Sequence, residues 1–98
     1  MNIIKLNGDK IELRNDKGSF IRTITDKAKS AQLSACGELV VITKLDGKVE
    51  LRNENGSFIR SITDKAFDAR FYEDDLAITK VDGKIELRMR SGSFIRSI

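Results

Sequence analysis

The feature that most constrains the fold is a block of residues that occurs three times along the chain. It reads KIELRNDKGSFIR at 10–22, KVELRNENGSFIR at 48–60 and KIELRMRSGSFIR at 84–96. Its glycines, Gly18, Gly56 and Gly92, give spacings of 38 and 36 residues. A period of this length is the signature of a repeat architecture, in which each unit buries its apolar face against its neighbours. The 98 residues are therefore interpreted as one domain with repeats at 1–27, 28–65 and 66–98.

Each repeat is predicted to be a meander of strands. In the second repeat, residues 39–45 are apolar and rich in β-branched side chains, as in a buried strand. Asp46-Gly47 is a two-residue hairpin signal, and 48–53 alternates apolar and charged residues. A second glycine-containing turn at 54–56 leads into a third strand at 57–62.

The segments that connect the repeats have room for one further strand each, at 30–35 and 67–72. The first segment has helical character over 27–33, but its partner alternates, and repeats should share a structure. The first repeat begins at Met1 with its second strand and so lacks the first. The fold class is therefore all-β, with three tandem four-stranded antiparallel repeats of which the first lacks one strand, giving eleven strands in total.

Composition favours a cytoplasmic protein without catalytic chemistry. No apolar run approaches the roughly 18 residues of a membrane span, and no signal peptide is visible. Cys36 is the single cysteine, as expected in a reducing compartment. With no histidine in the chain, the commonest general base and zinc ligand is missing. We therefore expect no enzyme activity, cofactor or metal; the acidic run 73–75 is interpreted as a solvated turn.

The last repeat, FDARFYEDDLAITKVDGKIELRMRSGSFIRSI at 67–98, resembles the WD-type β-propeller repeat. The shared pattern is a strand, a turn, an apolar strand, Asp-Gly, a strand, a glycine-containing turn and a last strand. Where that family has Trp-Asp, this chain has Leu-Arg, as at Leu51-Arg52, and Thr-Asp stands in place of Gly-His. The resemblance implies a propeller-like fold that binds partners on one face of a ring.

A second resemblance is to the bulb mannose-binding lectins, on the stretch LDGKVELRNENGSFIRSIT. It implies three sheets arranged as a monomeric β-prism. The sugar site of that family needs Gln-x-Asp-x-Asn-x-Val-x-Tyr, and the matching window, 43–51, has neither the Gln nor the Tyr. A carbohydrate-binding β-prism is the alternative to the propeller.

Three units do not close a propeller, which usually has 4–8 blades. Six is the one multiple of three in that range. We therefore expect a homodimer in which two chains complete one six-bladed ring, whereas a β-prism would remain a monomer.

The expected function is that of a non-catalytic binding or scaffold module, with a protein or peptide bound on one ring face. Asp26-Lys27 and Asp64-Lys65 lie in the loops between repeats and would all open on that face. The repeated arginines Arg22, Arg60 and Arg96 are the other candidate partner-binding residues. Nucleic acid is a less favoured partner, because the net charge is only +3 and the signs are interspersed.

Overall fold

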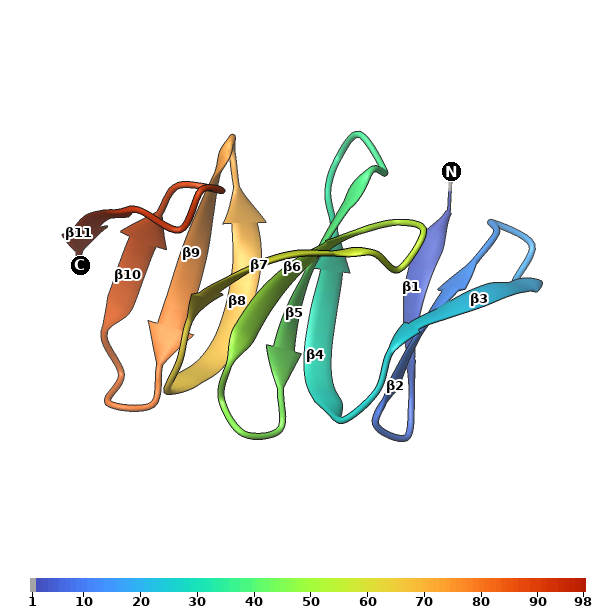
Figure 1. The fold of residues 1–98 in the computed structure, drawn as a ribbon, viewed down its shortest axis with the longest axis horizontal. Coiled ribbons are helices and arrows are strands. Elements are labelled where there is room, and N and C mark those ends of the chain that lie inside the picture. The colour runs from blue at the N-terminus through green and yellow to red at the C-terminus, as the bar shows by residue number, and fades with distance from the viewer. Residues whose placement is uncertain (1) are drawn as a thin grey trace.

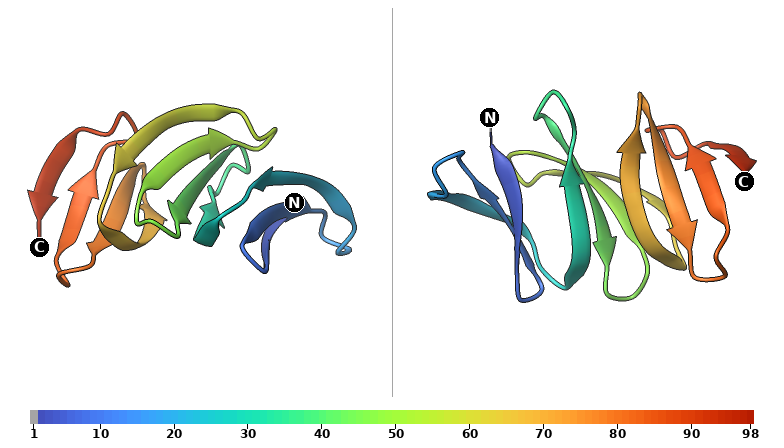
Figure 2. Two further views of the ribbon diagram at one scale, coloured as in Figure 1. Left: turned by 60° about the horizontal axis from the view of Figure 1, so that its bottom comes forward. Right: turned by 180° about the vertical axis from the view of Figure 1, so that it is seen from behind.

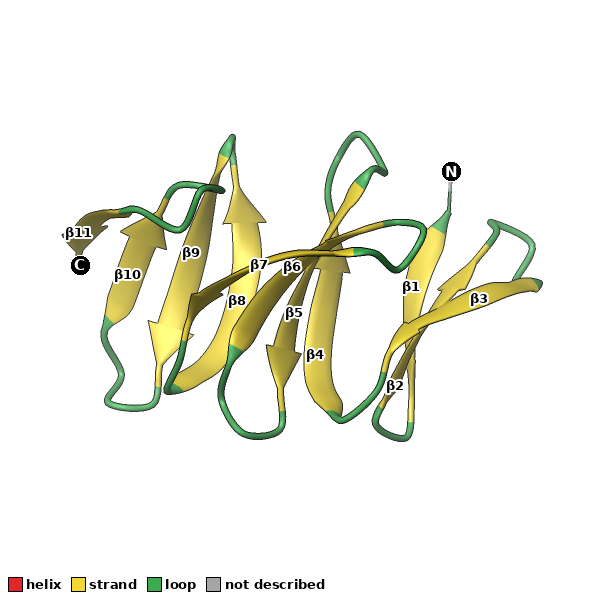
Figure 3. Ribbon diagram, viewed as in Figure 1, coloured by secondary structure: helices red, strands yellow, loops and turns green. Residues whose placement is uncertain are grey.

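The computed structural model describes residues 2–98, so Met1, which begins the first predicted repeat, lies outside the described residues. Eleven strands form three antiparallel sheets of 3, 4 and 4 strands, and residues 2–98 contain no helix (Figure 3). It follows that none of these residues belongs to a helix able to cross a membrane. For residues 2–98, the prediction of an all-β chain with three strands in its first unit and four in each of the others is confirmed.

The strands follow one another in each sheet in the order of the sequence (Figure 1). Sheet 1 contains β1 (Ile3–Asn7), β2 (Lys10–Arg14) and β3 (Phe20–Thr25). Sheet 2 contains β4 (Ala28–Leu33), β5 (Leu39–Lys44), β6 (Val49–Asn53) and β7 (Phe58–Thr63). Sheet 3 contains β8 (Ala66–Tyr72), β9 (Asp75–Lys80), β10 (Ile85–Arg88) and β11 (Phe94–Ser97). The three sheets lie in a curved row (Figure 2).

The two strands predicted in the connecting segments are present, and each begins earlier than expected. β4 and β8 both start at a buried alanine, Ala28 or Ala66. The N–H of Ala28 donates to the Asp9 carbonyl and that of Ala66 to the Gly47 carbonyl, both at 2.9 Å. Each strand is therefore fastened at its first residue to the hairpin turn of the preceding sheet.

The prediction of a two-residue hairpin turn at Asp46-Gly47 is wrong. The Lys44 N–H donates to the Lys48 carbonyl at 2.8 Å, which leaves residues 45–47 in a three-residue loop. Gly47 has φ +92° and occupies the left-handed position that ends such a loop in a β-bulge. Asp-Gly fits this loop as well as the shorter turn, because glycine supplies positive φ in both. The two-residue turn occurs instead at Gly8-Asp9, between β1 and β2.

Two apolar cores lie between the three sheets. We call the face of a sheet that carries Leu13, Leu51 or Leu87 its front face, and the opposite face its back face. The core between the front of sheet 1 and the back of sheet 2 comprises Ile11, Leu13, Ile24, Ala28, Val40 and Ile42. The core between the front of sheet 2 and the back of sheet 3 comprises Val41, Val49, Leu51, Ile62, Ala66, Ala69, Leu76 and Ile78. Sheet 2 is thus covered on both faces, in agreement with the apolar run Leu39-Val40-Val41-Ile42 of β5.

The repeated Glu-x-Arg and Gly-Ser-Phe motifs form one unit on each back face. In sheet 1, the Arg14 guanidinium pairs with Glu12 at 2.8 Å and donates to the Gly18 carbonyl at 2.7 Å. The same guanidinium lies 5.8 Å from the ring centre of Phe20. Sheets 2 and 3 repeat this arrangement, with Glu–Arg distances of 3.0 Å. The ion pairs therefore run along one strand and not across strands, because Arg22, Arg60 and Arg96 lie on the front faces.

Acid should weaken the fold through Glu12. Hydrogen bonds from Arg14, and then from Asn7, hold the pKa of the Glu12 carboxyl below its ordinary value of 4.5. A carboxyl whose pKa is lower in the folded state stabilises above its unfolded pKa and loses that contribution as pH falls through the folded pKa. We expect the free energy of unfolding to decrease below about pH 5, and to decrease less in Glu12→Gln, measured by urea denaturation at several pH values. Glu38→Gln, at an exposed residue, is the control. Equal acid sensitivity in both variants would contradict this role.

Candidate functional site

The loops that join the sheets were predicted as a partner-binding surface, and both open on the same edge of the sheets (Figure 1). Their backbones are engaged in holding neighbouring sheets together. The Lys44 ammonium donates to Thr25 Oγ1 at 3.0 Å and to the Asp26 carbonyl. Lys80 makes the same two bonds one sheet further on, to Thr63 Oγ1 at 3.1 Å and to the Asp64 carbonyl. We call each of these arrangements a lysine clamp.

The lysines of these loops adopt an uncommon backbone conformation. Lys27 and Lys65 have φ of 51° and 52°, in the left-handed region that residues with side chains seldom adopt. Their carbonyls accept hydrogen bonds from the N–H groups of Leu45 and Val81, at 2.8 and 3.0 Å. The side chains of Lys27, Lys65 and of Asp26 and Asp64 are exposed. The loops are therefore fixed in shape, with their four charged side chains directed to solvent.

The repeated arginines do not form one basic surface. Arg22, Arg60 and Arg96 occupy equivalent positions on β3, β7 and β11, each opposite the leucine of the neighbouring strand. Arg60 donates to the Arg90 carbonyl of sheet 3 at 3.3 Å. Arg22 and Arg60 thus lie on the front faces that pack against the next sheet, and Arg96 lies on the uncovered front face of sheet 3.

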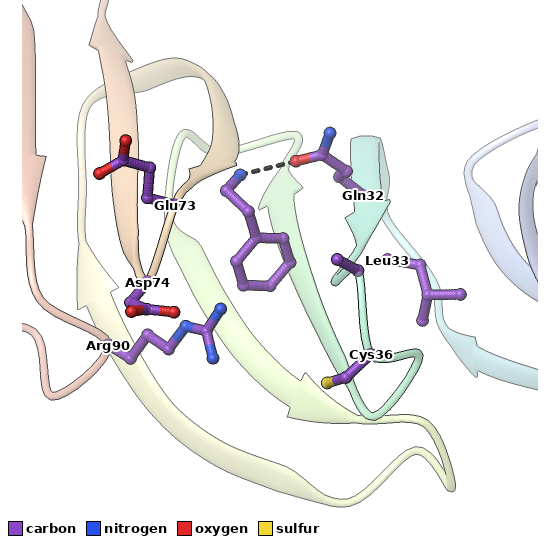
Figure 4. A pocket seen from close by; sticks show the side chains of 8 residues that line it. Gln32, Leu33, Cys36, Glu73, Asp74 and Arg90 are labelled. Carbon is purple, nitrogen blue, oxygen red and sulfur yellow. Dashed lines mark hydrogen bonds between the residues drawn. The ribbon is translucent and has the colours of Figure 1, made fainter.

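The larger cavity lies at the other edge of the sheets, away from the loops with Asp26 and Asp64. It has a volume of about 510 Å³ and lies between the ends of β4 and β8. Figure 4 shows Gln32 and Cys36 on one side and Glu73, Asp74 and Arg90 on the other. Leu33, Ala35 and Phe71 complete the lining. Its size is that of a small-ligand or side-chain pocket.

Arg90 is the unusual residue of this cavity. Its guanidinium lies 5.1 Å from the ring centre of Phe71. Its Nε atom is buried without a hydrogen-bond partner in the described chain. Gln32 fixes the opposite wall, because its Oε1 accepts the Phe71 N–H at 2.6 Å. The cavity thus presents a cation on an aromatic ring, with two carboxylates on the same side as the cation.

The Cys36 thiol lies at the rim of the same cavity. The Ser34 hydroxyl, 3.3 Å from Cys36 Sγ, lowers the pKa of the thiol, and the backbone of Glu38 adds to this effect. Ser34 Oγ also accepts the Leu39 N–H at 3.1 Å, so its own proton is available to the sulfur. Within residues 2–98, no three carboxylate or thiol groups come together in a way that could hold a metal ion.

Sequence reasoning missed this cavity, although the repeats carry a signal for it. Arg90 occupies the position of Asp16 and Glu54 in the other copies, and Phe71 that of Leu33. Leu33, Phe71 and Arg90 all line this one cavity. A second cavity of about 280 Å³ adjoins Asp64, so one predicted residue does line a depression.

No protein-family model matches the chain, and no curated protein matches it. The function proposed below therefore rests on the geometry of the sheets and of the cavity.

Proposed function

We propose that this chain is a non-catalytic binding module that assembles with a second copy of itself into a ring of six sheets. In this ring, the front of sheet 3 of each chain covers the back of sheet 1 of the other. The contact would repeat the front-to-back contact that the chain makes twice internally.

The observation that supports this proposal is the exposure of equivalent front-face residues. Ile62 and Leu51 of sheet 2 are 6% and 2% exposed, under the cover of sheet 3. Their counterparts in sheet 3 are Ile98, which is 73% exposed, and Leu87, which is half-buried. On the opposite side of the molecule, Ile3 on the back of sheet 1 is 49% exposed, whereas its counterpart Val40 is fully buried. The front of sheet 3 and the back of sheet 1 are thus both left uncovered.

The mass in solution tests this assembly. We expect light scattering to give twice the 11.0 kDa of one chain. Leu87→Glu should give a monomer, because a charge on the front of sheet 3 could not be buried unpaired. Val81→Glu, at an exposed turn residue of the same sheet, should remain a dimer. A wild-type monomer at all concentrations, or a Leu87→Glu dimer, would refute the ring.

We further propose that the edge with the larger cavity recognises the partner, as a peptide or protein that supplies an acceptor to Arg90. The support is the unpartnered Arg90 Nε and the presence of arginine where the other two repeats have Asp16 and Glu54. Peptides selected against the chain by phage display should lose affinity with Arg90→Ala and keep it with Lys65→Ala. The opposite result would assign binding to the loops with Asp26, Lys27, Asp64 and Lys65.

A further inference from the structure

The edge of sheet 1 formed by β1 is where the three sheets differ most. β4 and β8, the first strands of sheets 2 and 3, are the edge strands on this side, whereas among the described residues β1 is the edge strand of sheet 1. The two-residue turn makes Asn7 and Lys10 the first hydrogen-bonded pair of β1 and β2. Because ladder bonds alternate along a strand, the N–H and C=O groups of Ile4 and Leu6 point to the open edge.

Sheet 2 shows how such an edge is filled. The counterparts of Ile4 and Leu6 are Val41 and Thr43, and these pair with Gln32 and Ser30 of β4. With β4 in place, Thr43 is fully buried, whereas Leu6 at the open edge is 46% exposed. A row of unpaired backbone groups beside exposed apolar side chains is a template for strand addition.

We propose that this edge binds an extended peptide segment of a partner protein as a fourth, antiparallel strand of sheet 1. The segment alternates polar and apolar residues, in the order polar–Ala–polar–(Leu or Phe). This order is that of residues 30–33 in β4 and 68–71 in β8, the strands that fill the same position in the other sheets. The inference goes beyond the proposed function, because no residue of β1 lines the cavity with Arg90. It also does not require the ring to close.

The two faces of the bound segment meet different neighbours. On the back face, Leu33 lies opposite Val40, whose counterpart in β1 is the exposed Ile3. The terminal Leu or Phe of the segment therefore packs on Ile3.

On the front face, the segment lies beside β4 as β4 lies beside β8. Gln32 of β4 accepts the N–H of Phe71, and the counterpart of Phe71 in β4 is Leu33. A glutamine at the second polar position of the segment would accept the Leu33 N–H in the same way. The sequence Ser-Ala-Gln-Leu, as in β4, therefore fits best.

The test uses a fluorescein-labelled peptide, AKSAQLSA, which copies residues 28–35. We expect saturable binding in fluorescence anisotropy, with amide shifts at Ile4 and Leu6 in NMR spectra. Two analogues provide the matched comparison. Methylation of the backbone nitrogen of the peptide's glutamine removes a ladder bond to β1 and should weaken binding about tenfold or more. Methylation at the alanine before it, whose N–H points away from β1, should leave affinity within about twofold.

Absence of saturable binding, or equal affinity of the two methylated peptides, would overturn the inference. It would also be overturned if the amides of Ile4 and Leu6 became protected from hydrogen exchange with rising protein concentration and without peptide, since a second copy would then occupy the edge. Light scattering on the same samples separates the two proposals. A dimer that binds no peptide would support the two-chain assembly and contradict only the proposed binding of a peptide at the β1 edge.

Discussion

Truncation of Leu51 to alanine is expected to lower the free energy of unfolding by about 2–5 kcal/mol. The same change at Leu87 should cost less than half as much in dilute protein. Both leucines hold the same position in their repeats, but Leu51 is covered by sheet 3 and 2% exposed, whereas Leu87 is half-buried. Urea denaturation at low protein concentration measures both values, and Leu13→Ala, at the third equivalent position, should match Leu51→Ala.

The way in which the cost of Leu87→Ala changes with protein concentration reports on assembly. If a second copy covers the front of sheet 3, dimerisation adds to stability by mass action, and the cost of Leu87→Ala should rise with protein concentration. A cost at Leu87 as large as at Leu51 in the most dilute samples would contradict the assignment of Leu87 to an open face.

Loss of a lysine clamp should have the second-largest effect. Lys44→Met removes the ammonium that bonds Thr25 Oγ1 and the Asp26 carbonyl, and keeps an apolar side chain of similar length. Hydrogen bonds from a charged group contribute about 1.5–3 kcal/mol, so we expect a loss of that order in the free energy of unfolding. Lys80→Met should behave alike, because it breaks the equivalent clamp between sheets 2 and 3.

Lys84→Met provides the control for the clamps, because Lys84 is an exposed lysine next to the β9–β10 turn. Its effect should stay within about 0.5 kcal/mol. Thermal or urea unfolding of the three variants checks the ranking. An equal, small effect in all three would show that the clamps do not hold the sheets together.

The strands could be predicted from the sequence because their signals are local. The alternation at 48–53 and the apolar run of β5 depend on side chains a few residues apart. β2 and β10 repeat the alternation, and β9 repeats the apolar run. The turn at 54–56 was predicted correctly, but the length of the turn at Asp46-Gly47 was not, since Asp-Gly is compatible with both two-residue and three-residue loops. Deciding between them requires the backbone hydrogen bond from Lys44 to Lys48.

The site could not be predicted in the same way, because its contacts join different sheets. Asp26 and Asp64 were identified as loop residues, but the lysines that bind their carbonyls lie 18 and 16 residues further on. The cavity likewise joins Cys36 and Gln32 to Arg90. Such pairs become visible only when the packing of one sheet on the next is known.

Sheet 1 differs from the other two sheets in having Asn7 at the position of the clamp lysine. This asparagine stands where Lys44 and Lys80 stand in sheets 2 and 3, and it bonds Glu12 of its own sheet at 3.3 Å. Sheet 1 therefore has no lysine clamp that could bond the loop of a sheet packed on its back face. In a ring of two chains, the two seams between copies would lack the fastenings that hold each chain together. Under dilution or mechanical load, such a ring would part at its seams into two intact halves and could close again without refolding.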